Sequence, residues 1–302
     1  MTGPEVSVVI ATRERPQLLR RAIASVLAQR NTGPIEVIVV FDGTRIDPLD
    51  DIDPGRHTVT VIPNRRAPGL AGARNSGILE ASGSAIAFCD DDDEWKPEKL
   101  REQLEVIADP AVALCATGIE IHSEGGVHER LAPAVTGLDQ LLHSRITELH
   151  PSSFLMRTST LKHEIGPVDE RIPSSYGEDY DLLLRAAKVG PIIAVPQALT
   201  IVHWDRVSYF TEKWQAVAGG LSYLLDKYPE FARDPVGSAR IEGQIAFAYS
   251  ALGDGAEARS WARRSMQHAP LQPRAYLAML IGTGLLSGEG VVAALNRRGR
   301  GV

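Results

Sequence analysis

Short runs of apolar and β-branched residues alternate with segments of helical periodicity through the first two thirds of the chain. Four runs near the N-terminus predict buried strands, at residues 5–11, 35–41, 57–62 and 84–89. After the first run, Leu19, Ile23 and Val26 recur at helical spacing and predict a helix, and a helix of small residues follows Gly69. This alternation predicts an α/β, Rossmann-like fold: an open, mostly parallel sheet with flanking helices.

The pattern continues less regularly to residue 203. Leu100, Leu104 and Ile107 mark the apolar face of a further helix. The other predicted elements are a strand at 111–121, a short helix near 137–143, a strand after a polar lead-in at 150–157, a helix opening at 178, and two short strands at 191–195 and 198–203. We therefore expect one α/β domain over residues 1–208.

Beyond Tyr209 the pattern indicates helices only, so we expect an all-helical C-terminal region over 209–302. Residues 246–268, with Gly253 and Asp254 between two helical stretches, resemble one hairpin of the tetratricopeptide kind. Stable arrays need several such units, so a single hairpin indicates a helical appendage docked on the α/β domain. Homodimer formation or partner binding through these helices stays open as the alternative.

The 302-residue chain has the composition of an ordinary globular protein, with 44% hydrophobic and 23% charged residues. Its formal charge of -6 argues against nucleic acid as a partner, because a duplex-binding protein needs a basic face. The apolar-rich run at 276–286 is too short to span a membrane and no signal peptide precedes Val6, so we expect a cytoplasmic protein without a transmembrane segment. The basic tail at 296–300 predicts disorder, with peripheral attraction to anionic lipids at the inner face of the membrane as the alternative.

The most unusual stretch is a run of five acidic residues at 90–94, directly after the apolar run at 84–89. Carboxylates this close raise one another's pKa unless a cation lies among them. Carboxylate oxygens, with water and substrate phosphates, are the usual ligands of Mg²⁺ and Mn²⁺. The run therefore predicts a divalent metal site, and a solvated acidic turn before the next helix is the alternative.

Polar residues also follow the other predicted strands. Thr12, Asp42 and Asn64 come after the first three. Ligands of open α/β sheets bind outside the C-terminal ends of the strands, so we expect these residues and the acidic run at one edge. Asp42 can accept a hydrogen bond from a uracil base, and Arg74 can offset diphosphate charge. Taken singly, such residues are more commonly turns, caps or surface positions.

Four motifs, in this order, make the sequence similar to the nucleotide-sugar half of glycosyltransferase family 2, whose members have the GT-A fold. They are VSVVIATR at 6–13, VVFDGT at 39–44, GARNSG at 72–77 and FCDDDDEW at 88–95. The resemblance extends over roughly residues 5–205. It implies a nucleotide-sugar half at about 1–96 and an acceptor half at about 97–208 of the predicted α/β domain.

The resemblance also implies roles for single residues. Asp90-Asp91-Asp92 matches the DxD motif of the family, so Asp92 is expected to coordinate the metal, with Asp90 and Asp91 supporting the metal and the donor ribose and sugar. The other residues of the expected donor site, which hold the nucleotide base or lie near its diphosphate, are Ala11, Thr12, Arg13, Asp42 and Arg74. The family often has two acidic residues after the second strand, and here Phe41 takes the place of the first.

A second acidic cluster, Glu178, Asp179 and Asp181, opens the helix after Gly177. Acidic residues in a first turn complement the helix dipole, which is the purely structural interpretation. Family 2 enzymes commonly carry a Glu-Asp pair at this point, and the resemblance implies that Asp179 is the general base of a direct displacement. Such a carboxylate can take the proton of the attacking hydroxyl as its oxygen bonds to the anomeric carbon.

Four residues are predicted near the metal or the acceptor. His203, at the end of the last strand, is a candidate metal or diphosphate ligand, as histidines after this strand are in some GT-A enzymes, and a hydrogen-bonded core histidine is the alternative. His150 and Glu178 are candidate acceptor contacts, and a structural or merely exposed histidine is the favoured alternative for His150. Trp204 is a candidate stacking surface for a sugar, although aromatic residues at such positions also simply pack.

The sequence thus predicts a metal-dependent inverting glycosyltransferase with Mn²⁺ or Mg²⁺ as cofactor. Its donor would be a nucleoside-diphosphate sugar, chiefly a UDP-sugar, and its acceptor a carbohydrate, lipid-linked or small-molecule hydroxyl. Two other classes stay open. A nucleotidyltransferase needs a glycine-rich basic loop after the first strand, whereas ATRER at 11–15 has arginines without glycines. A non-catalytic sugar-nucleotide-binding or scaffolding protein would use the helical region as its working surface.

Overall fold

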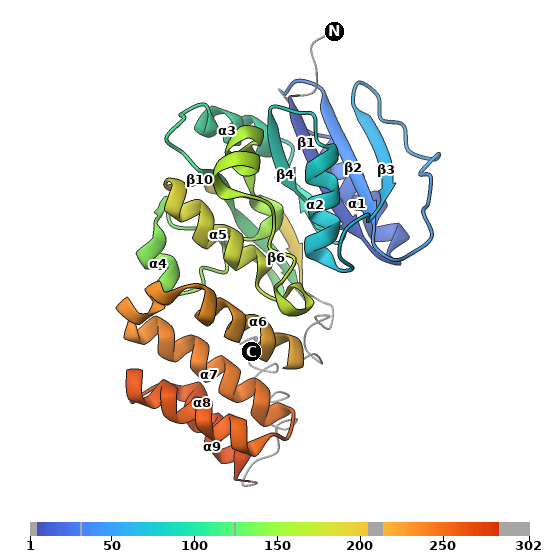
Figure 1. The fold of residues 1–302 in the computed structure, drawn as a ribbon. Coiled ribbons are helices and arrows are strands. Elements are labelled where there is room, and N and C mark those ends of the chain that lie inside the picture. Colours follow the sequence, from blue (N-terminus) through green and yellow to red (C-terminus); the bar gives the residue numbers. More distant parts are fainter. Residues whose placement is uncertain (1–4, 31, 124, 205–213, 284–302) are drawn as a thin grey trace. The chain divides into compact units, whose positions relative to one another are not determined.

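The computed structural model describes residues 5–30, 32–123, 125–204 and 214–283 (Figure 1). These residues form two compact units. The ranges that make up the first unit are 5–141, 146–170 and 178–204, and those of the second are 142–145, 171–177 and 214–283. The predicted domain border at 208 and the basic tail at 296–300 lie outside the described residues.

One sheet of ten strands forms the centre of the first unit. Its strands are β1 (Val6–Thr12), β2 (Ile35–Phe41), β3 (Thr58–Pro63), β4 (Ala85–Phe88), β5 (Glu94–Trp95), β6 (Leu114–Ser123), β7 (Gly126–Arg130), β8 (Val135–Thr136), β9 (Leu155–Arg157) and β10 (Ile192–His203). They lie in the order β3-β2-β1-β4-β9-β6-β10-β5, while β7 pairs with β6 and β8 with β10. The first four in this order pair in parallel, as do β6 and β10, so the predicted open, mostly parallel sheet is confirmed.

Two features of the sheet differ from the prediction. Strand β9 is antiparallel to both β4 and β6, and it separates two groups of parallel strands. The two short strands predicted at 191–195 and 198–203 are one strand, β10, whose register against β6 shifts on either side of Ala198. Pro196 interrupts the apolar pattern there and has no N–H to donate, and the chain accommodates it as an irregularity within the strand.

Helices flank the sheet and make up the regular structure of the second unit. The α-helices are α1 (Pro16–Leu27), α2 (Leu70–Glu80), α3 (Lys99–Ile107), α4 (Leu138–His143), α5 (Glu178–Val189), α6 (Trp214–Lys227), α7 (Pro235–Ala251), α8 (Gly255–His268) and α9 (Pro273–Gly282). Short turns of other helix types lie at Pro151–Ser153, Thr160–Ile165, Pro173–Ser175 and Pro229–Arg233. None of the helices in the described ranges is long and apolar enough for a membrane span.

Helices α1 and α2 cover opposite faces of the parallel strands, because successive side chains of a strand point to opposite faces. Val8 of β1 belongs to the same buried cluster as Ile23 of α1. Val9 faces α2, which lies in front of β1 and β2 in Figure 1: a Cβ placed on Gly77 would be 2.3 Å from Val9 Cγ1. Glycine at position 77 therefore permits the close approach of α2 to β1.

In the second unit, α7, α8 and α9 pack through small residues. A cluster of buried alanines lies between them: Ala246, Ala262, Ala275 and Ala278. Gly253 joins α7 to α8 with a φ of 81°, a left-handed conformation that costs glycine little. Asp254 then caps α8 by accepting from Glu257 N at 3.0 Å. The predicted helices of 246–268 are present as α7 and α8, joined by this turn.

Candidate active site

The C-terminal ends of the parallel strands β3, β2, β1 and β4 meet at one edge of the sheet. Asp42 N donates to Thr12 O at 3.0 Å, and Asn64 N donates to Phe41 O at 2.8 Å. Residues 90–94, which we name the acidic turn, begin two residues after Phe88, the last residue of β4, which pairs with β1. Parallel pairing therefore makes neighbours of polar residues that are far apart in the sequence.

The loop between β3 and α2 closes over Asp42. Asn64 Nδ2 donates to Asp42 Oδ1 at 2.7 Å, and Gly69 N donates to the two carboxylate oxygens at 3.2 and 3.1 Å. A Cβ on Gly72 would lie 1.8 Å from Ala67 O, so the loop can pack in this way only against a glycine. Asp42 is thus buried and held at the strand end by amide donors, where it remains the candidate contact for the base.

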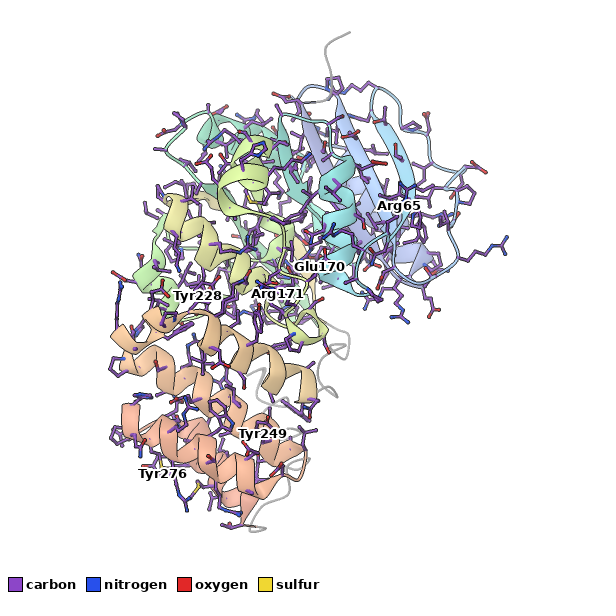
Figure 2. The ribbon with its side chains drawn as sticks, viewed as in Figure 1. Arg65, Glu170, Arg171, Tyr228, Tyr249 and Tyr276 are labelled. Carbon is purple, nitrogen blue, oxygen red and sulfur yellow. The ribbon has the colours of Figure 1, made fainter. Side chains whose placement is uncertain are left out.

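Glu170 ties this loop to the second half of the first unit. Glu170, labelled in Figure 2, accepts from Asn75 Nδ2 at 2.6 Å and pairs with Arg66. Arg65, also labelled in Figure 2, donates its backbone N–H to Ser76 Oγ at 3.1 Å. Asn75 and Ser76 of the GARNSG motif therefore shape the loop over the strand ends.

Thr12 and Arg15 hold one side of the acidic turn. Thr12 Oγ1 donates to Asp91 Oδ2 at 2.7 Å, while Arg15 Nη1 lies 3.0 Å from Asp91 Oδ1 and 2.8 Å from Asp92 Oδ2. Burial raises the pKa of Asp91 to about 6, against the opposite effects of the Thr12 hydrogen bond and the Arg15 charge. Arg15 was not among the predicted site residues, and its only sequence signal is its place three residues after the strand end.

On the other side of the turn, Asp90 and Asp93 lie close to His150. One carboxylate oxygen of each and one imidazole nitrogen lie within 4.8 Å of one another, a grouping that could hold a metal ion. His150 Nδ1 is 3.4 Å from Asp93 Oδ2, which accepts from Ser152 Oγ at 2.5 Å. Burial, reinforced by Asp90, raises the pKa of Asp93 well above its usual range. Burial also lowers the pKa of His150, which favours the neutral imidazole that binds metals.

This grouping differs from the ligand set that the resemblance implies. Asp92, the expected metal ligand, bonds to Arg15, and His203 Nε2 lies 2.8 Å from Glu94 Oε1. His150 was expected near the acceptor. Two carboxylates and a neutral imidazole form a donor set rich in the hard oxygens that Mn²⁺ and Mg²⁺ prefer, so the residues of the acidic turn fit the implied metal.

Arg74 is buried between the two acidic motifs. Its Nη2 lies 2.6 Å from Asp90 Oδ1, and its Nη1 pairs with Glu178 at the start of α5. Burial acts to lower the pKa of Arg74, but the charges of Glu178 and Asp90 outweigh it and raise that pKa. The guanidinium therefore joins the acidic turn to the Glu-Asp pair across the fold of the first unit.

Asp179 lies beside this ion-pair cluster. It is half-buried, and its charge acts on Arg74, Glu178 and His150. Burial raises the pKa of Glu178 to about 7, opposed by Arg74 and reinforced by Asp179. Within the described part of the chain, Glu178 Oε2 is buried without a hydrogen-bond partner. The fold thus brings Asp179, the candidate base, close enough to His150 and Arg74 for its charge to act on them, next to the residues that could hold a metal ion.

The remaining predicted residues make other contacts. His203 packs edge-to-face against His122, with ring centroids 5.2 Å apart. Trp204 is 45% exposed and has Arg130 Cζ 5.1 Å from its ring centroid. At the end of the first strand, Ala11 is half-buried and Arg13 is exposed.

A buried polar network supports the acidic turn. Lys99 is fully buried, with Nζ 2.7 Å from Gln103 Oε1 and 3.8 Å from the Trp95 ring centroid. Gln103 Nε2 donates to Ser153 O at 2.7 Å, and Trp95 Nε1 donates to Ser152 O at 2.7 Å. The network links α3 to the Pro151–Ser153 turn. Sequence reasoning missed it because lysine and glutamine on a helix usually face solvent.

We expect Lys99→Met to flatten the dependence of stability on pH between pH 7 and 9. Burial lowers the pKa of Lys99 to about 7, whereas an unfolded lysine titrates near 10.4. Between these values the unfolded chain binds more protons, so Lys99 makes the free energy of unfolding rise with pH, by about 2 kcal/mol over this interval. Urea unfolding of both proteins at pH 7 and pH 9 checks this, and an equal rise in the two would contradict it.

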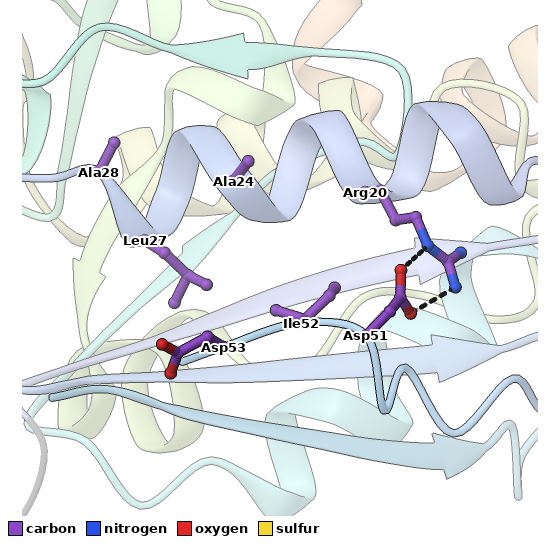
Figure 3. Close-up of a pocket in the computed structure, with 7 residues that line it drawn as sticks. All are labelled: Arg20, Ala24, Leu27, Ala28, Asp51, Ile52 and Asp53. Atoms are coloured by element: carbon purple, nitrogen blue, oxygen red, sulfur yellow. Dashed lines mark hydrogen bonds and ion pairs between the residues drawn. The ribbon is translucent and has the colours of Figure 1, made fainter. Parts of the chain in front are cut away.

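A surface hollow of about 500 Å³ lies elsewhere, between α1 and the 51–53 loop (Figure 3). Its lining residues are Arg20, Ala24, Leu27, Ala28, Asp51, Ile52 and Asp53. Arg20 Nε lies 2.7 Å from Asp51 Oδ2, so the cation that lines it is already paired. None of the lining residues belongs to the predicted donor, metal or acceptor set. The hollow is therefore not the candidate site, which stays at the acidic turn.

Comparison with known proteins decides the family. The sequence pattern described as "Glycosyl transferase family 2" matches residues 7–164, just over half of the 302-residue chain. The chain belongs to glycosyltransferase family 2. One relative, the pre-mycofactocin glycosyltransferase of Mycobacterium tuberculosis, is 29% identical over 217 residues. That match covers 68% of this chain and 44% of the relative, so the chain spans less than half the length of that protein.

Two solved structures extend the family 2 assignment to the fold. S. aureus TarS, in complex with UDP-GlcNAc, aligns over 98% of this chain and 92% of its own, with 16% identity and a TM-score of 0.62. The mannosyltransferase PcManGT from Pyrobaculum calidifontis, in complex with GDP-Man and Mn²⁺, aligns over 93% of this chain and 80% of its own, with 17% identity and a TM-score of 0.56. The predicted family and the predicted GT-A fold are both confirmed.

Proposed function

We propose that this family 2 chain is a metal-dependent inverting glycosyltransferase that moves a sugar from a nucleoside-diphosphate sugar to a hydroxyl acceptor. The observation that carries the proposal is the group formed by Asp90, Asp93, His150, Arg74 and Asp179. It combines a metal-competent donor set with a candidate base. A single displacement needs both, because a diphosphate must leave while a hydroxyl loses its proton.

We infer a UDP-sugar as the donor. The expected contacts with its base are Ala11, Thr12, Arg13 and Asp42, and the Asp42 carboxylate is suited to accept from the imide N–H of uracil. The fold neighbours support a nucleotide-sugar donor, since TarS was solved with UDP-GlcNAc and PcManGT with GDP-Man. The uracil preference rests on the sequence pattern, and a donor screen tests it directly.

We infer Mn²⁺ or Mg²⁺ as the cofactor, a choice supported by the Mn²⁺ in the PcManGT structure. Asp90, Asp93 and His150 would hold the ion. The family pattern implies a different ligand, Asp92, and the two assignments can be tested against each other. When bound, the ion supplies a Lewis acid that stabilises the charge developing on the diphosphate leaving group. Arg15, which bonds to Asp92 and Asp91, is a further cation at this edge of the sheet.

Asp179 would act as the base. Its half-buried carboxylate can accept the proton of an acceptor hydroxyl during attack on the anomeric carbon. Glu178 is less suited to this role, because it is buried and Arg74 pairs with one of its oxygens, whereas the Asp179 side chain is half-buried. Glu178 and Trp204 remain candidate contacts for the acceptor, which would be a carbohydrate, a lipid-linked sugar or a small-molecule hydroxyl. His150, which the sequence placed near the acceptor, is assigned here to the metal.

A screen of nucleotide sugars for hydrolysis tests this function without knowledge of the acceptor, because slow transfer to water reveals the donor. We expect Mn²⁺-dependent release of UDP from one UDP-sugar, lost on chelation and restored by added Mn²⁺. Turnover of a GDP-sugar alone would overturn the donor assignment. Calorimetric binding of a nucleotide sugar with no turnover, with or without acceptor extracts, would favour the scaffolding alternative.

A further inference from the structure

The hydroxyl of Ser152 lies between two residues of the candidate metal grouping. It accepts from Asp90 N at 2.9 Å and donates to Asp93 Oδ2 at 2.5 Å, and the Ser152 side chain is fully buried. A serine hydroxyl has one proton, so donation to Asp93 and acceptance from Asp90 fix its orientation. The backbone of one residue and the carboxylate of the other are therefore held at a set spacing.

The same residue also contacts the third member of the grouping. Ser152 N donates to His150 Nδ1 at 3.4 Å, the nitrogen that lies 3.4 Å from Asp93 Oδ2. Asp93 N donates in turn to Asp90 O at 3.1 Å, so the two aspartates already lie on one tight turn. Ser152 is thus the residue through which the acidic turn is bonded to the short helix that follows His150.

Ser152 is itself held rigidly. Trp95 Nε1 donates to Ser152 O at 2.7 Å, and Gln103 Nε2 donates to the next carbonyl, that of Ser153, at 2.7 Å. Both serines are fully buried in the turn Pro151–Ser153. A hydrogen-bond donor on a fixed support can hold Asp93 in place against the repulsion of the neighbouring carboxylates.

We propose that Ser152 is a positioning residue that sets the mutual spacing of Asp90, Asp93 and His150 for a divalent cation. The inference rests on the metal-dependent function proposed above. Hydrogen-bond partners of metal ligands orient those ligands, and their loss typically lowers metal affinity about 10- to 100-fold. Ser152 does not contact the metal or the substrate in this proposal, and it acts only through the ligands.

The test is direct measurement of Mn²⁺ affinity in the full chain, by calorimetry and by the electron paramagnetic resonance of free Mn²⁺, without any sugar donor. We expect Ser152→Ala to bind Mn²⁺ about tenfold or more weakly than the native protein. Ser153→Ala is the matched control, because it removes a neighbouring buried hydroxyl that donates to His150 O at 2.7 Å. It should lose a comparable amount of stability to urea and keep the native Mn²⁺ affinity.

Ser152→Cys provides a second variant of nearly native volume with a weaker donor, and we expect an intermediate affinity. It also replaces Ser152→Ala if that variant does not fold. Native Mn²⁺ affinity in the Ser152 variants, or an equal loss in Ser153→Ala, would overturn the inference. Absence of Mn²⁺ binding by the native protein would instead overturn the metal dependence in the proposed function, so the two failures are distinguishable.

Discussion

Asp179→Asn is expected to bind its sugar nucleotide and Mn²⁺ like the native protein and to transfer sugar about 10²- to 10⁴-fold more slowly, the contribution typical of a positioned general base. The amide keeps the shape of the side chain but cannot accept the hydroxyl proton. Donor affinity by calorimetry and transfer by nucleotide release measure the two effects separately. Transfer at the native rate would show that Asp179 is not the base.

Asp181→Asn is the matched control for this experiment. Asp181 lies in the first turn of the same helix, is fully buried and bonds to Arg185 Nε at 2.8 Å. Its substitution removes the same helix-dipole contribution and weakens a buried ion pair, so it should lower stability while leaving transfer intact. Equal loss of transfer in both variants would mean that the effect comes from disruption of α5 and not from loss of a base.

Asp93→Asn is expected to lower Mn²⁺ affinity by at least about 100-fold. Loss of a residue that only hydrogen-bonds to a metal ligand costs up to about 100-fold in affinity, and the loss of a ligand itself should cost at least as much. The amide has nearly the volume of the carboxylate and can still accept from Ser152, so the turn should keep its shape. It has no charge to offer the cation. Mn²⁺ titration and Mn²⁺-dependent UDP binding, both by calorimetry, measure the loss, and unchanged values would exclude Asp93 as a ligand.

Asp92→Ala distinguishes the two ligand sets. If Asp92 is the ligand that the family pattern implies, its removal should abolish metal-dependent donor binding. If the grouping of Asp90, Asp93 and His150 holds the ion, Asp92→Ala should weaken Mn²⁺ binding much less than Asp93→Asn does, because Asp92 bonds to Arg15. If Asp92→Ala weakened Mn²⁺ binding more than Asp93→Asn did, Asp92 would be the metal ligand.

The parallel half of the sheet could be predicted from the sequence because burial on both faces leaves a continuous local signal. β2 matches its predicted range of 35–41, and β1 is displaced by one residue from 5–11. Strand β9 has only three residues, and nothing in its own sequence states that it runs antiparallel between two parallel groups. Strand direction depends on how the chain returns to the sheet, which is not a local property.

Most residues of the candidate site could be predicted from the sequence, but their contacts with one another could not. The residue types and their places after the strands identified the acidic turn, Asp42 and Asp179, with the family resemblance supplying their roles. The partners of these groups could not be predicted, because Arg74 and Glu178 are 104 positions apart in the chain and Ser152 is 59 positions from Asp93. A buried ion pair or hydrogen bond over such a distance leaves no periodic mark in the sequence.

By itself, the sequence determined the family, the order of the first four strands and of helices α1 and α2 among them, and the run of carboxylates that follows β4. Tertiary structure alone decided that Arg15 pairs with Asp91 and Asp92, that Arg74 pairs with Asp90, and that Asp90 and Asp93 lie with His150 in a group that could hold a metal ion. The physical reason is that the charge state and the ligand geometry of a carboxylate depend on burial and on its neighbours in space. Neighbours along the chain determine only that such a group is present.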